Sequence, residues 1–535
     1  VVPRSNPSSA FPDVLSLRQT PEGFEALKNE MVPDWLDADR TDYRLYTGDQ
    51  TINIWWNALY KMPIARGYFD PPSLKSRGYF FWLDAALSQN DSGKDQLAET
   101  FNYPEDIAFN NTRFLVDWYA TKFLEAGPTP ATITRLPASL EKEEFIKNKE
   151  LLNFNAERFN KGGEDLTYYE LADELVTPIL AATNAPTIGI FGSDEGYETV
   201  VRALADANLN SRSLIPIKLG VNIDQYSLDE LQNFNALIFY DYKYKNKDVG
   251  FRRIQKYVEA GGKVFIDTGV EVPESESQAP LPEIFPIENT VRKPIERTWS
   301  FEIEENILTD GVDFSKFSLP LFDNDPWKLS FPKDGEDLRL DSSVLIRNHN
   351  FPVFVSKKIG EGEVYWSGLN LAYHVIRFHN TEEASFFKNI IEGLVGNISD
   401  SKQTTGNPTF VSAQNRKISI TSGSGVIFKE QNYPGWEANI SSGGKRKLLK
   451  VWSAGPAYPG FMYVKIPEDF LGEEATIDFS YNGSLATWVL TILSFVIMLS
   501  IFDLVILRGS VLAKTVKFLT SKAMRQTSVW WARED

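Results

Sequence analysis

The stretch TIGIFG, residues 187–192, is a short apolar run that ends in glycine. Comparable short apolar runs follow it at residues 213–217, 236–240 and 263–267. Runs without polar alternation are typical of strands buried on both faces of a parallel sheet. Helix-like segments at 198–207 and 249–260 alternate with these runs. This alternation predicts right-handed βαβ crossovers and a parallel sheet covered by helices on both faces.

The surrounding sequence extends this core into an α/β domain at residues 184–396. Pro, Glu and Ser become frequent at 273–340, which indicates an insertion, and strand-like runs resume after it. A closing helix is expected at 382–395. We therefore predict a doubly wound parallel-sheet domain, similar in layout to the amidotransferase class but without the cysteine of that class.

Two further regions flank this domain. Residues 1–183 are predicted to be mixed and mainly helical, with apolar positions near helical period at 105–125 and another helix at 166–182. Residues 405–483 alternate in short runs with frequent turns, which predicts a small β-sandwich. The predicted fold class is thus a multidomain α/β protein, completed by one C-terminal transmembrane helix.

Residues 485–507 read LATWVLTILSFVIMLSIFDLVIL and contain one charged residue, Asp503. At ~1.5 Å per residue this helix reaches roughly 34 Å, enough for a hydrocarbon core of ~30 Å, so a transmembrane helix is predicted. The tail at 508–535 is basic, which places it in the cytoplasm and the bulk of the chain outside the cell membrane. Asp503 then either reaches interfacial water or faces a partner membrane helix.

The composition excludes several classes of function. The 535-residue chain has a formal net charge of −17, which argues against nucleic acid as a partner. It has no cysteine, which excludes disulfides, thiolate metal sites and a cysteine nucleophile. The spacing of His374 and His379 does not place them on one helical face, so no metal site is expected.

Candidate site residues lie where the predicted parallel strands end, because open α/β sheets bind ligands outside the carboxyl ends of their strands. Three acids occupy such positions, Asp194, Asp241 and Asp267, accompanied by Tyr240 and Thr268. Together they would hold sugar hydroxyls or a hard cation that prefers oxygen ligands. The alternative is that each acid caps a helix or a turn. Thr268 follows the fourth strand as a nucleophile would, but no base to activate it is evident.

Four groups of residues occur in a distinctive order along the chain. They are YRL at 43–45 with GYFD at 67–70, the block from 185 to 262, GEGEV and SGLNL within 360–371, and NYPGW at 432–436 before the final β region and apolar helix. In this order they resemble the large membrane proteins of the YfhO type, some of which carry the label "6-pyruvoyl-tetrahydropterin synthase-related". That family looks like the GT-C class of membrane glycosyltransferases.

The resemblance implies a protein with many N-terminal membrane helices, a lipid-linked sugar donor and external C-terminal domains. The catalytic acid of such enzymes lies among the early helices, so no catalytic residue carries over to this sequence, and no cofactor is implied. We expect an extracytoplasmic, membrane-anchored portion that binds or positions a glycan or an acceptor. One alternative is a surface-anchored structural or adhesion module. Another is a hydrolase that uses Asp194, Asp241 and Asp267.

Overall fold

The computed structural model describes residues 32–37, 40–47, 60–65, 74–88, 95–126, 137–153, 165–277, 279–334, 337–396, 398, 406–483, 485–505, 514–515 and 518. The chain divides into two compact units. The first comprises residues 1–432 and 438–478, and the second comprises residues 433–437 and 479–535. The first unit contains the candidate site.

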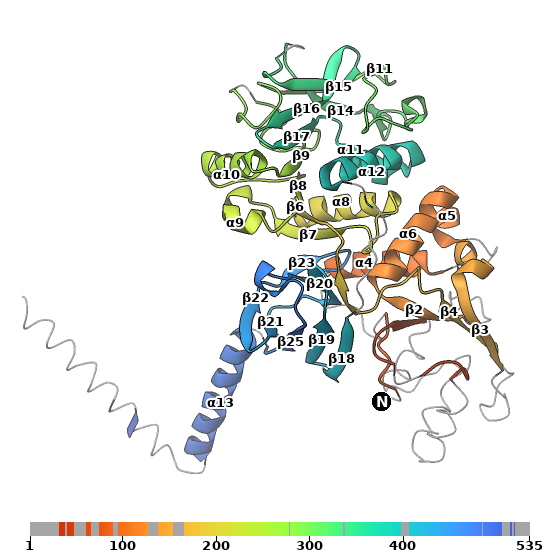
Figure 1. Ribbon diagram of the computed structural model, residues 1–535, viewed down its shortest axis with the longest axis vertical. Coiled ribbons are helices and arrows are strands. Elements are labelled where there is room, and N and C mark those ends of the chain that lie inside the picture. The colour runs from red at the N-terminus through yellow and green to blue at the C-terminus, as the bar shows by residue number, and fades with distance from the viewer. Residues whose placement is uncertain are drawn as a thin grey trace, which may run out of the picture. The chain divides into compact units, whose positions relative to one another are not determined.

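A large mixed sheet forms the centre of the first unit, and Figure 1 shows its strands. Its strand order in the described part of the chain is β11-β15-β16-β17-β9-β8-β6-β7-β23-β24-β20-β5. The five middle strands are parallel and are β17 (Gly362–Ser367), β9 (Lys263–Asp267), β8 (Ala236–Phe239), β6 (Thr187–Phe191) and β7 (Ile215–Gly220). The runs predicted from sequence as parallel strands are therefore strands here.

Antiparallel strands extend this parallel core on both sides. On one side lie β16 (Phe351–Ile359), β15 (Ser342–Asn348) and β11 (Phe301–Ile303). On the other side lie β23 (Trp452–Ala454), β24 (Phe461–Lys465), β20 (Gly425–Gln431) and β5 (Leu180–Thr183). The sheet thus unites segments that the sequence assigns to three separate regions.

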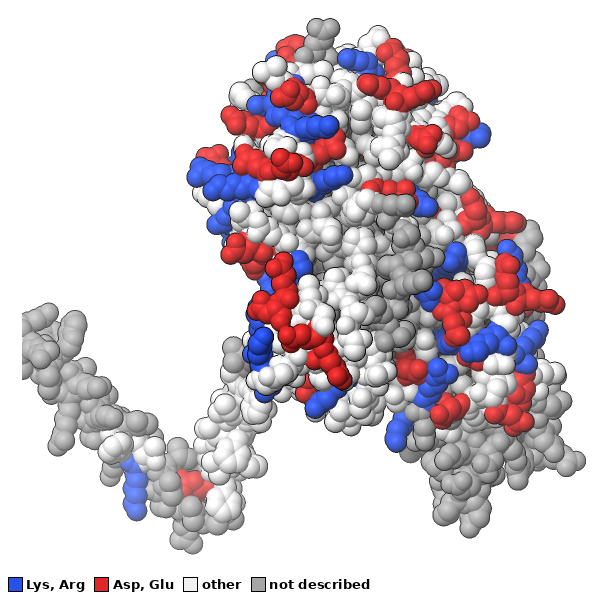
Figure 2. Space-filling view, viewed as in Figure 1, with Lys and Arg blue, Asp and Glu red and all other residues white. Residues whose placement is uncertain are grey.

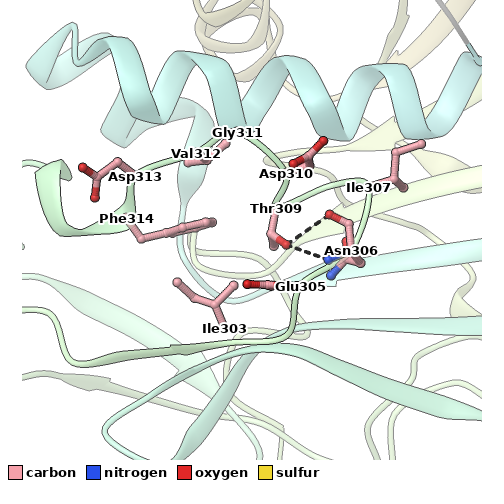
Figure 3. Close-up of a pocket in the computed structure, with 10 residues that line it drawn as sticks. All are labelled: Ile303, Glu305, Asn306, Ile307, Thr309, Asp310, Gly311, Val312, Asp313 and Phe314. Atoms are coloured by element: carbon pink, nitrogen blue, oxygen red, sulfur yellow. Dashed lines mark hydrogen bonds between the residues drawn. The ribbon is translucent and has the colours of Figure 1, made fainter.

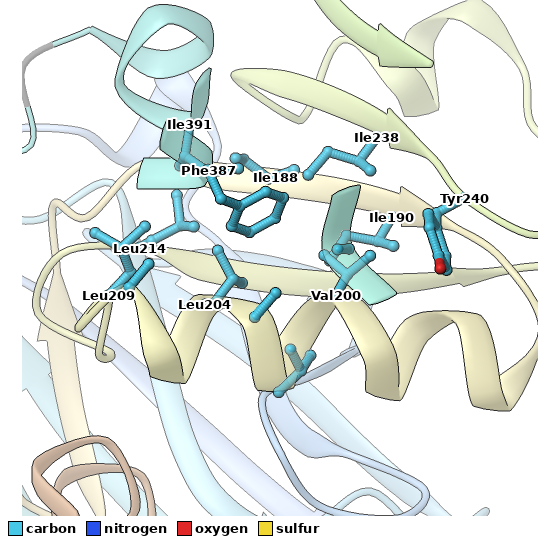
Figure 4. Close-up of a cluster of buried hydrophobic side chains, with 14 of the residues drawn as sticks. Ile188, Ile190, Val200, Leu204, Leu209, Leu214, Ile238, Tyr240, Phe387 and Ile391 are labelled. Carbon is cyan, nitrogen blue, oxygen red and sulfur yellow. The ribbon is translucent and has the colours of Figure 1, made fainter. Parts of the chain in front are cut away.

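Helices cover both faces of the parallel strands. They are α8 (Asp194–Asp206), α9 (Leu228–Leu231), α10 (Lys247–Glu259), α11 (Leu371–Phe378) and α12 (Thr381–Val395). In Figure 1, α9 and α10 lie on one side of the strands, and α8, α11 and α12 lie on the other. Figure 4 shows the apolar layer between α8 and the sheet, which includes Ile188 and Ile190 of β6, Leu204 of α8 and Phe387 of α12. This packed layer fixes both ends of α8, and each end carries a polar site.

The N-terminal region contains a second sheet with the order β1-β2-β4-β3. The strands of this sheet are β1 (Arg44–Thr47), β2 (Thr121–Ala126), β3 (Ile146–Asn153) and β4 (Asp165–Leu171). The helices of the same region are α4 (Leu74–Ala86), α5 (Gln96–Phe101) and α6 (Glu105–Trp118). The helix predicted within 105–125 is α6. The helix predicted at 166–182 is wrong, because this segment forms β4 and enters β5. The run LTYYEL within β4 is rich in aromatic residues, which fit a half-buried strand.

The strands expected at 405–483 divide between two sheets. Five of them form a sheet of order β18-β19-β25-β21-β22, with bounds Asn407–Ser412, Asn415–Ile420, Ala475–Tyr481, Trp436–Ser442 and Lys445–Leu449. The remaining strands, β20, β23 and β24, belong to the large sheet. The region is rich in β-strands as predicted, but part of it completes the central sheet.

The predicted fold class is wrong in its overall description. The structure is mainly β, with large mixed sheets in place of a purely parallel sheet beside a mainly helical region. The apolar run near the C-terminus forms α13 (Leu485–Val505), and residues 506–507 of the predicted span lie outside the described residues. Within the described residues, none of the helices combines the length and the apolar character that crossing a membrane requires. This finding contradicts the predicted transmembrane helix.

Candidate functional site

The first acid of the predicted site, Asp194, opens α8 directly after β6. Its carboxylate forms ion pairs with Lys218 of β7, at 2.5 Å between Nζ and Oδ1, and with Lys75 of α4. Both lysine Nζ atoms also lie over the ring of Tyr458, at 5.2 Å for Lys218 and 5.7 Å for Lys75. Partial burial acts to raise the pKa of Asp194, but hydrogen bonds from the two lysines outweigh it and lower the pKa. Asp194 is therefore a neutralised anion at physiological pH.

The second acid, Asp241, follows β8 and has a left-handed backbone with φ of 54°. The hydroxyl of Ser193 donates to its carboxylate, and the same hydroxyl accepts a hydrogen bond from the N–H of Gly196 at 3.1 Å, which caps α8. Gly192 permits this close turn, because a Cβ there would lie 2.4 Å from the carbonyl oxygen of Tyr240. The segment GSDEG thus packs the start of α8 tightly against the end of β8.

The third acid, Asp267, is fully buried at the end of β9. Its carboxylate accepts hydrogen bonds from the backbone N–H groups of Gly269 at 2.9 Å, Asn370 at 3.0 Å and Leu371 at 2.8 Å. Asn370 has φ of 56° and stands between β17 and α11. Burial raises the pKa of Asp267 to about 6, although these hydrogen bonds oppose the increase. Asp267 therefore fastens the turn before α11 to the end of β9.

Tyr240 and Thr268 complete the predicted set, and both are buried. The Tyr240 hydroxyl donates to Oδ1 of Asn370 at 2.5 Å, and burial raises the pKa of Tyr240 well above its ordinary value. The Thr268 hydroxyl accepts from Nε1 of Trp366 at 2.9 Å and donates to the carbonyl oxygen of Ser367 at 3.4 Å. Enclosure of this hydroxyl argues against its use as a nucleophile.

The structure separates the five predicted residues into two groups. Asp194 and Asp241 border the capped start of α8 and are partly exposed, whereas Asp267, Tyr240 and Thr268 are enclosed around the β9 and β17 ends. Each acid stabilises a turn or a helix start, which was the alternative interpretation of the sequence. The exposed group alone faces solvent and is available to a ligand.

Three residues that contact Asp194 or its lysine partners were not identified from the sequence. Lys75, Lys218 and Tyr458 come from distant segments, and Lys75 is 119 residues from Asp194 in the chain. No local motif marks them, because their role depends on how α4, β7 and the segment before β24 meet. Lys218 directly follows the apolar run predicted at 213–217, so it is the one of these three residues that the rule on strand ends could have found.

The two histidines considered from sequence occupy separate sites. His374 is buried and its Nδ1 lies 2.7 Å from Oε2 of Glu383, while Nδ1 of His379 lies 2.8 Å from Oδ2 of Asp206. Tyr103 stacks on His379 with 3.5 Å between ring centroids. Among the residues that the structure describes, no cluster of three or more His, Asp and Glu is suited to hold a metal.

A larger cavity of about 870 Å³ lies in the insertion, at the loop between β11 and the short helix at Phe314–Lys316 (Figure 3). Figure 3 shows Thr309 hydrogen-bonded to Asn306, with Asp310 next to this pair and Asp313 farther along the loop. Ile307 at its rim is 83% exposed. None of the residues predicted from sequence as a site lines this cavity.

Comparisons with known proteins do not identify the chain. No family model matches it, and no curated protein matches it. A cytoplasmic protein of Salmonella typhimurium LT2 is similar over 39% of this chain and 99% of its own, with 15% identity and a TM-score of 0.28. A beta-galactosidase from Bacillus circulans sp. alkalophilus is similar over 54% of this chain and 42% of its own, with 13% identity and a TM-score of 0.26.

A thua-like protein from Parabacteroides merdae is similar over 41% of this chain and 92% of its own, with 10% identity and a TM-score of 0.25. Likenesses with such low TM-scores carry no information on function. The resemblance to membrane proteins of the YfhO type stays a prediction.

Proposed function

We propose that this chain is a non-catalytic module that binds and positions a glycan or a glycan acceptor. The binding surface is the exposed part of the carboxyl edge, which we call the rim. It consists of Lys75, Ser193, Asp194, Lys218, Asp241 and Tyr458. The carrying observation is that the rim combines a partly exposed aromatic ring with carboxylates, a hydroxyl and ammonium groups.

The chemistry of the rim suits a ligand with many hydroxyl groups. Each sugar hydroxyl donates one hydrogen bond and accepts others, so it pairs equally well with the Asp241 carboxylate and with the Lys218 ammonium group. An aromatic side chain such as Tyr458 offers apolar surface next to these polar groups. A few convergent polar groups beside apolar surface are the usual composition of a ligand site.

The same geometry argues against turnover at this edge. Hydrolysis of a glycoside uses two carboxyl groups that flank one bond. Asp267 is fully buried and accepts three backbone hydrogen bonds, and Asp194 is paired with two lysines. The hydroxyl of Thr268 is likewise occupied by Trp366 and Ser367. These arrangements favour binding over the hydrolase alternative.

A glycan array followed by calorimetric titration of the full chain tests this proposal. Lys218→Met removes a charged donor, and Asp241→Asn removes a negative charge while asparagine retains the left-handed conformation at position 241. We expect the Kd of a retained glycan to rise about tenfold or more in both variants, since each variant loses a charge-assisted hydrogen bond or replaces it with a neutral one. Asp229→Asn, an exposed acid on α9, is the control and should leave binding unchanged.

Two results would overturn the proposal. The first is that the array retains no glycan, and the second is that the rim variants bind as tightly as the control. Self-association of the chain without glycan binding would favour the structural or adhesion role instead.

A further inference from the structure

A small polar cavity of about 230 Å³ lies at the opposite end of α8 from the rim. It is lined by Arg113 of α6, by Asn208, Asn210 and Ser213 from the turn between α8 and β7, and by Lys388 of α12. Its volume is below the range of about 300–1,000 Å³ that is usual for drug-sized ligands. The cavity therefore fits a small group and not a nucleotide.

Two of the residues that line this cavity each carry a buried polar atom without a partner among the described residues. Nε of Arg113 and Oδ1 of Asn208 have no hydrogen-bond partner within the described part of the chain. Buried polar groups are nearly always hydrogen-bonded, because an unmade bond in a dry site costs free energy. A donor and an acceptor that lack partners, on two residues that line one cavity, are the observation from which we argue for a ligand there.

The cavity is also cationic. Arg113 forms no ion pair with any acid among the described residues, and its guanidinium carbon lies 5.7 Å from the centroid of the Phe109 ring. Lys388 brings a second positive charge, and its ion pair is with Glu392 on the same helix at 3.9 Å. Two cations from different helices thus meet in a chain with a formal net charge of −17. Figure 2 shows that charges of both signs are interspersed over the face that it displays.

Backbone groups at this end of α8 are already satisfied by the fold. Asn208, with φ of 57°, donates its N–H to the carbonyl oxygen of Ala205, and Leu209 donates to Leu204. The carbonyl oxygen of Asp206 accepts from the side chain of Asn110 at 2.9 Å. The exposed carbonyl groups that would repel an anion at a helix C-terminus are therefore occupied.

We propose that this cavity binds phosphate, either free or as a phosphate monoester. A phosphate oxygen would accept from Nε–H of Arg113, and a hydroxyl of the ligand would donate to Oδ1 of Asn208. Lys388 would balance the second negative charge. Guanidinium groups are well matched to phosphate oxygens in charge and geometry. This site is separate from the rim, so its test does not depend on glycan binding.

Calorimetric titration of the full chain at constant ionic strength tests the proposal, with inorganic phosphate, glucose 1-phosphate and sulfate as probes. We expect inorganic phosphate to bind more tightly than sulfate, because sulfate has no hydroxyl to donate to Asn208. Preference for glucose 1-phosphate over inorganic phosphate would identify a monoester as the ligand, and the reverse would identify the free anion.

Variants connect binding to the cavity. Arg113→Met and Lys388→Met should each raise the Kd for phosphate at least about tenfold, and Asn208→Asp should do the same by repulsion while retaining a left-handed backbone. Arg113→Lys keeps the positive charge but removes Nε–H. It should fold as the parent does and still bind phosphate more weakly. Arg252→Met and Lys256→Met on α10 are exposed controls that should bind as the parent does.

The proposal is overturned if phosphate produces no heat beyond that of chloride at equal ionic strength. It is also overturned if the α10 controls lose as much affinity as the cavity variants, which would indicate general charge effects. Unchanged binding in Arg113→Met, with a native circular dichroism spectrum, would show that water alone fills the cavity.

Discussion

The two ends of α8 both gather charged side chains from several elements, but they differ in how those charges are paired. At the N-terminal end, Asp194 is held between Lys75 and Lys218, so opposite charges meet. At the C-terminal end, Arg113 and Lys388 share a cavity in which Nε of Arg113 has no partner among the described residues. The rim therefore presents balanced charge beside a hydroxyl and an aromatic ring, whereas the cavity at the other end presents positive charge that acids of the fold do not balance at Arg113.

The largest expected effect would test whether the enclosed part of the carboxyl edge is structural. Asp267→Ala removes the acceptor of three backbone N–H groups in a buried turn. Each unsatisfied group costs ~1–3 kcal/mol, so we expect the free energy of unfolding to fall by about 3–5 kcal/mol. Urea denaturation followed by circular dichroism measures this change. A loss below about 1 kcal/mol, as at an exposed surface position, would show that the edge is not structural.

A smaller effect concerns the charge on Asp267. Its pKa is about 6 in the folded chain, against an ordinary value of 3.8, because burial disfavours the carboxylate. The folded state thus binds the proton more tightly, so this group contributes stability that is fully present below pH ~3.8 and is lost as pH rises through about 6. At about 1.36 kcal/mol per pH unit, the contribution is about 3 kcal/mol.

Asp267→Asn isolates this contribution, because asparagine does not titrate. All other carboxyl groups are shared by the parent and the variant, so their effects on the pH dependence of unfolding cancel when the two are compared. We expect the parent to lose about 2 kcal/mol relative to the variant when the pH is raised from about 4 to 7, because the contribution is no longer complete at pH 4. Unfolding curves of both proteins across this range provide the measurement. A constant difference between them would mean that Asp267 does not titrate with a raised pKa.

The sequence predicts those features whose cause lies within one segment, and it misses those that depend on contacts between distant segments. Strands β6, β8 and β9 were predicted because each is an uninterrupted apolar run between turns, which is a local signal. Asp194, Asp241 and Asp267 were identified because strand ends of a parallel sheet share one edge. The helix predicted at 166–182 was wrong because β4 is defined by its pairing with β2 and β3, and this pairing leaves no mark within the segment itself.

The sites themselves depended still more on distant contacts. Lys75 meets Asp194 through the packing of α4, and Arg113 meets Lys388 because α6 and α12 both pack against α8. Neither pair is marked by spacing or by a motif. The apolar run predicted at 485–507 is helical over residues 485–505, the part that the structure describes, but its hydropathy led to the transmembrane prediction that the structure contradicts.

The smallest expected effect returns to the N-terminal end of α8. The side chains of Asp194 and Lys75 are 34% and 48% exposed, and exposed ion pairs stabilise proteins by up to about 1 kcal/mol. Asp194→Ala should therefore lower the free energy of unfolding by less than about 1 kcal/mol, and the loss should shrink at 1 M salt because screening weakens the pairs that are removed. Denaturation at low and high salt measures both quantities. A loss that exceeds this limit and does not respond to salt would show that Asp194 acts as a buried structural acid like Asp267, and the distinction between the enclosed edge and the exposed rim would fail.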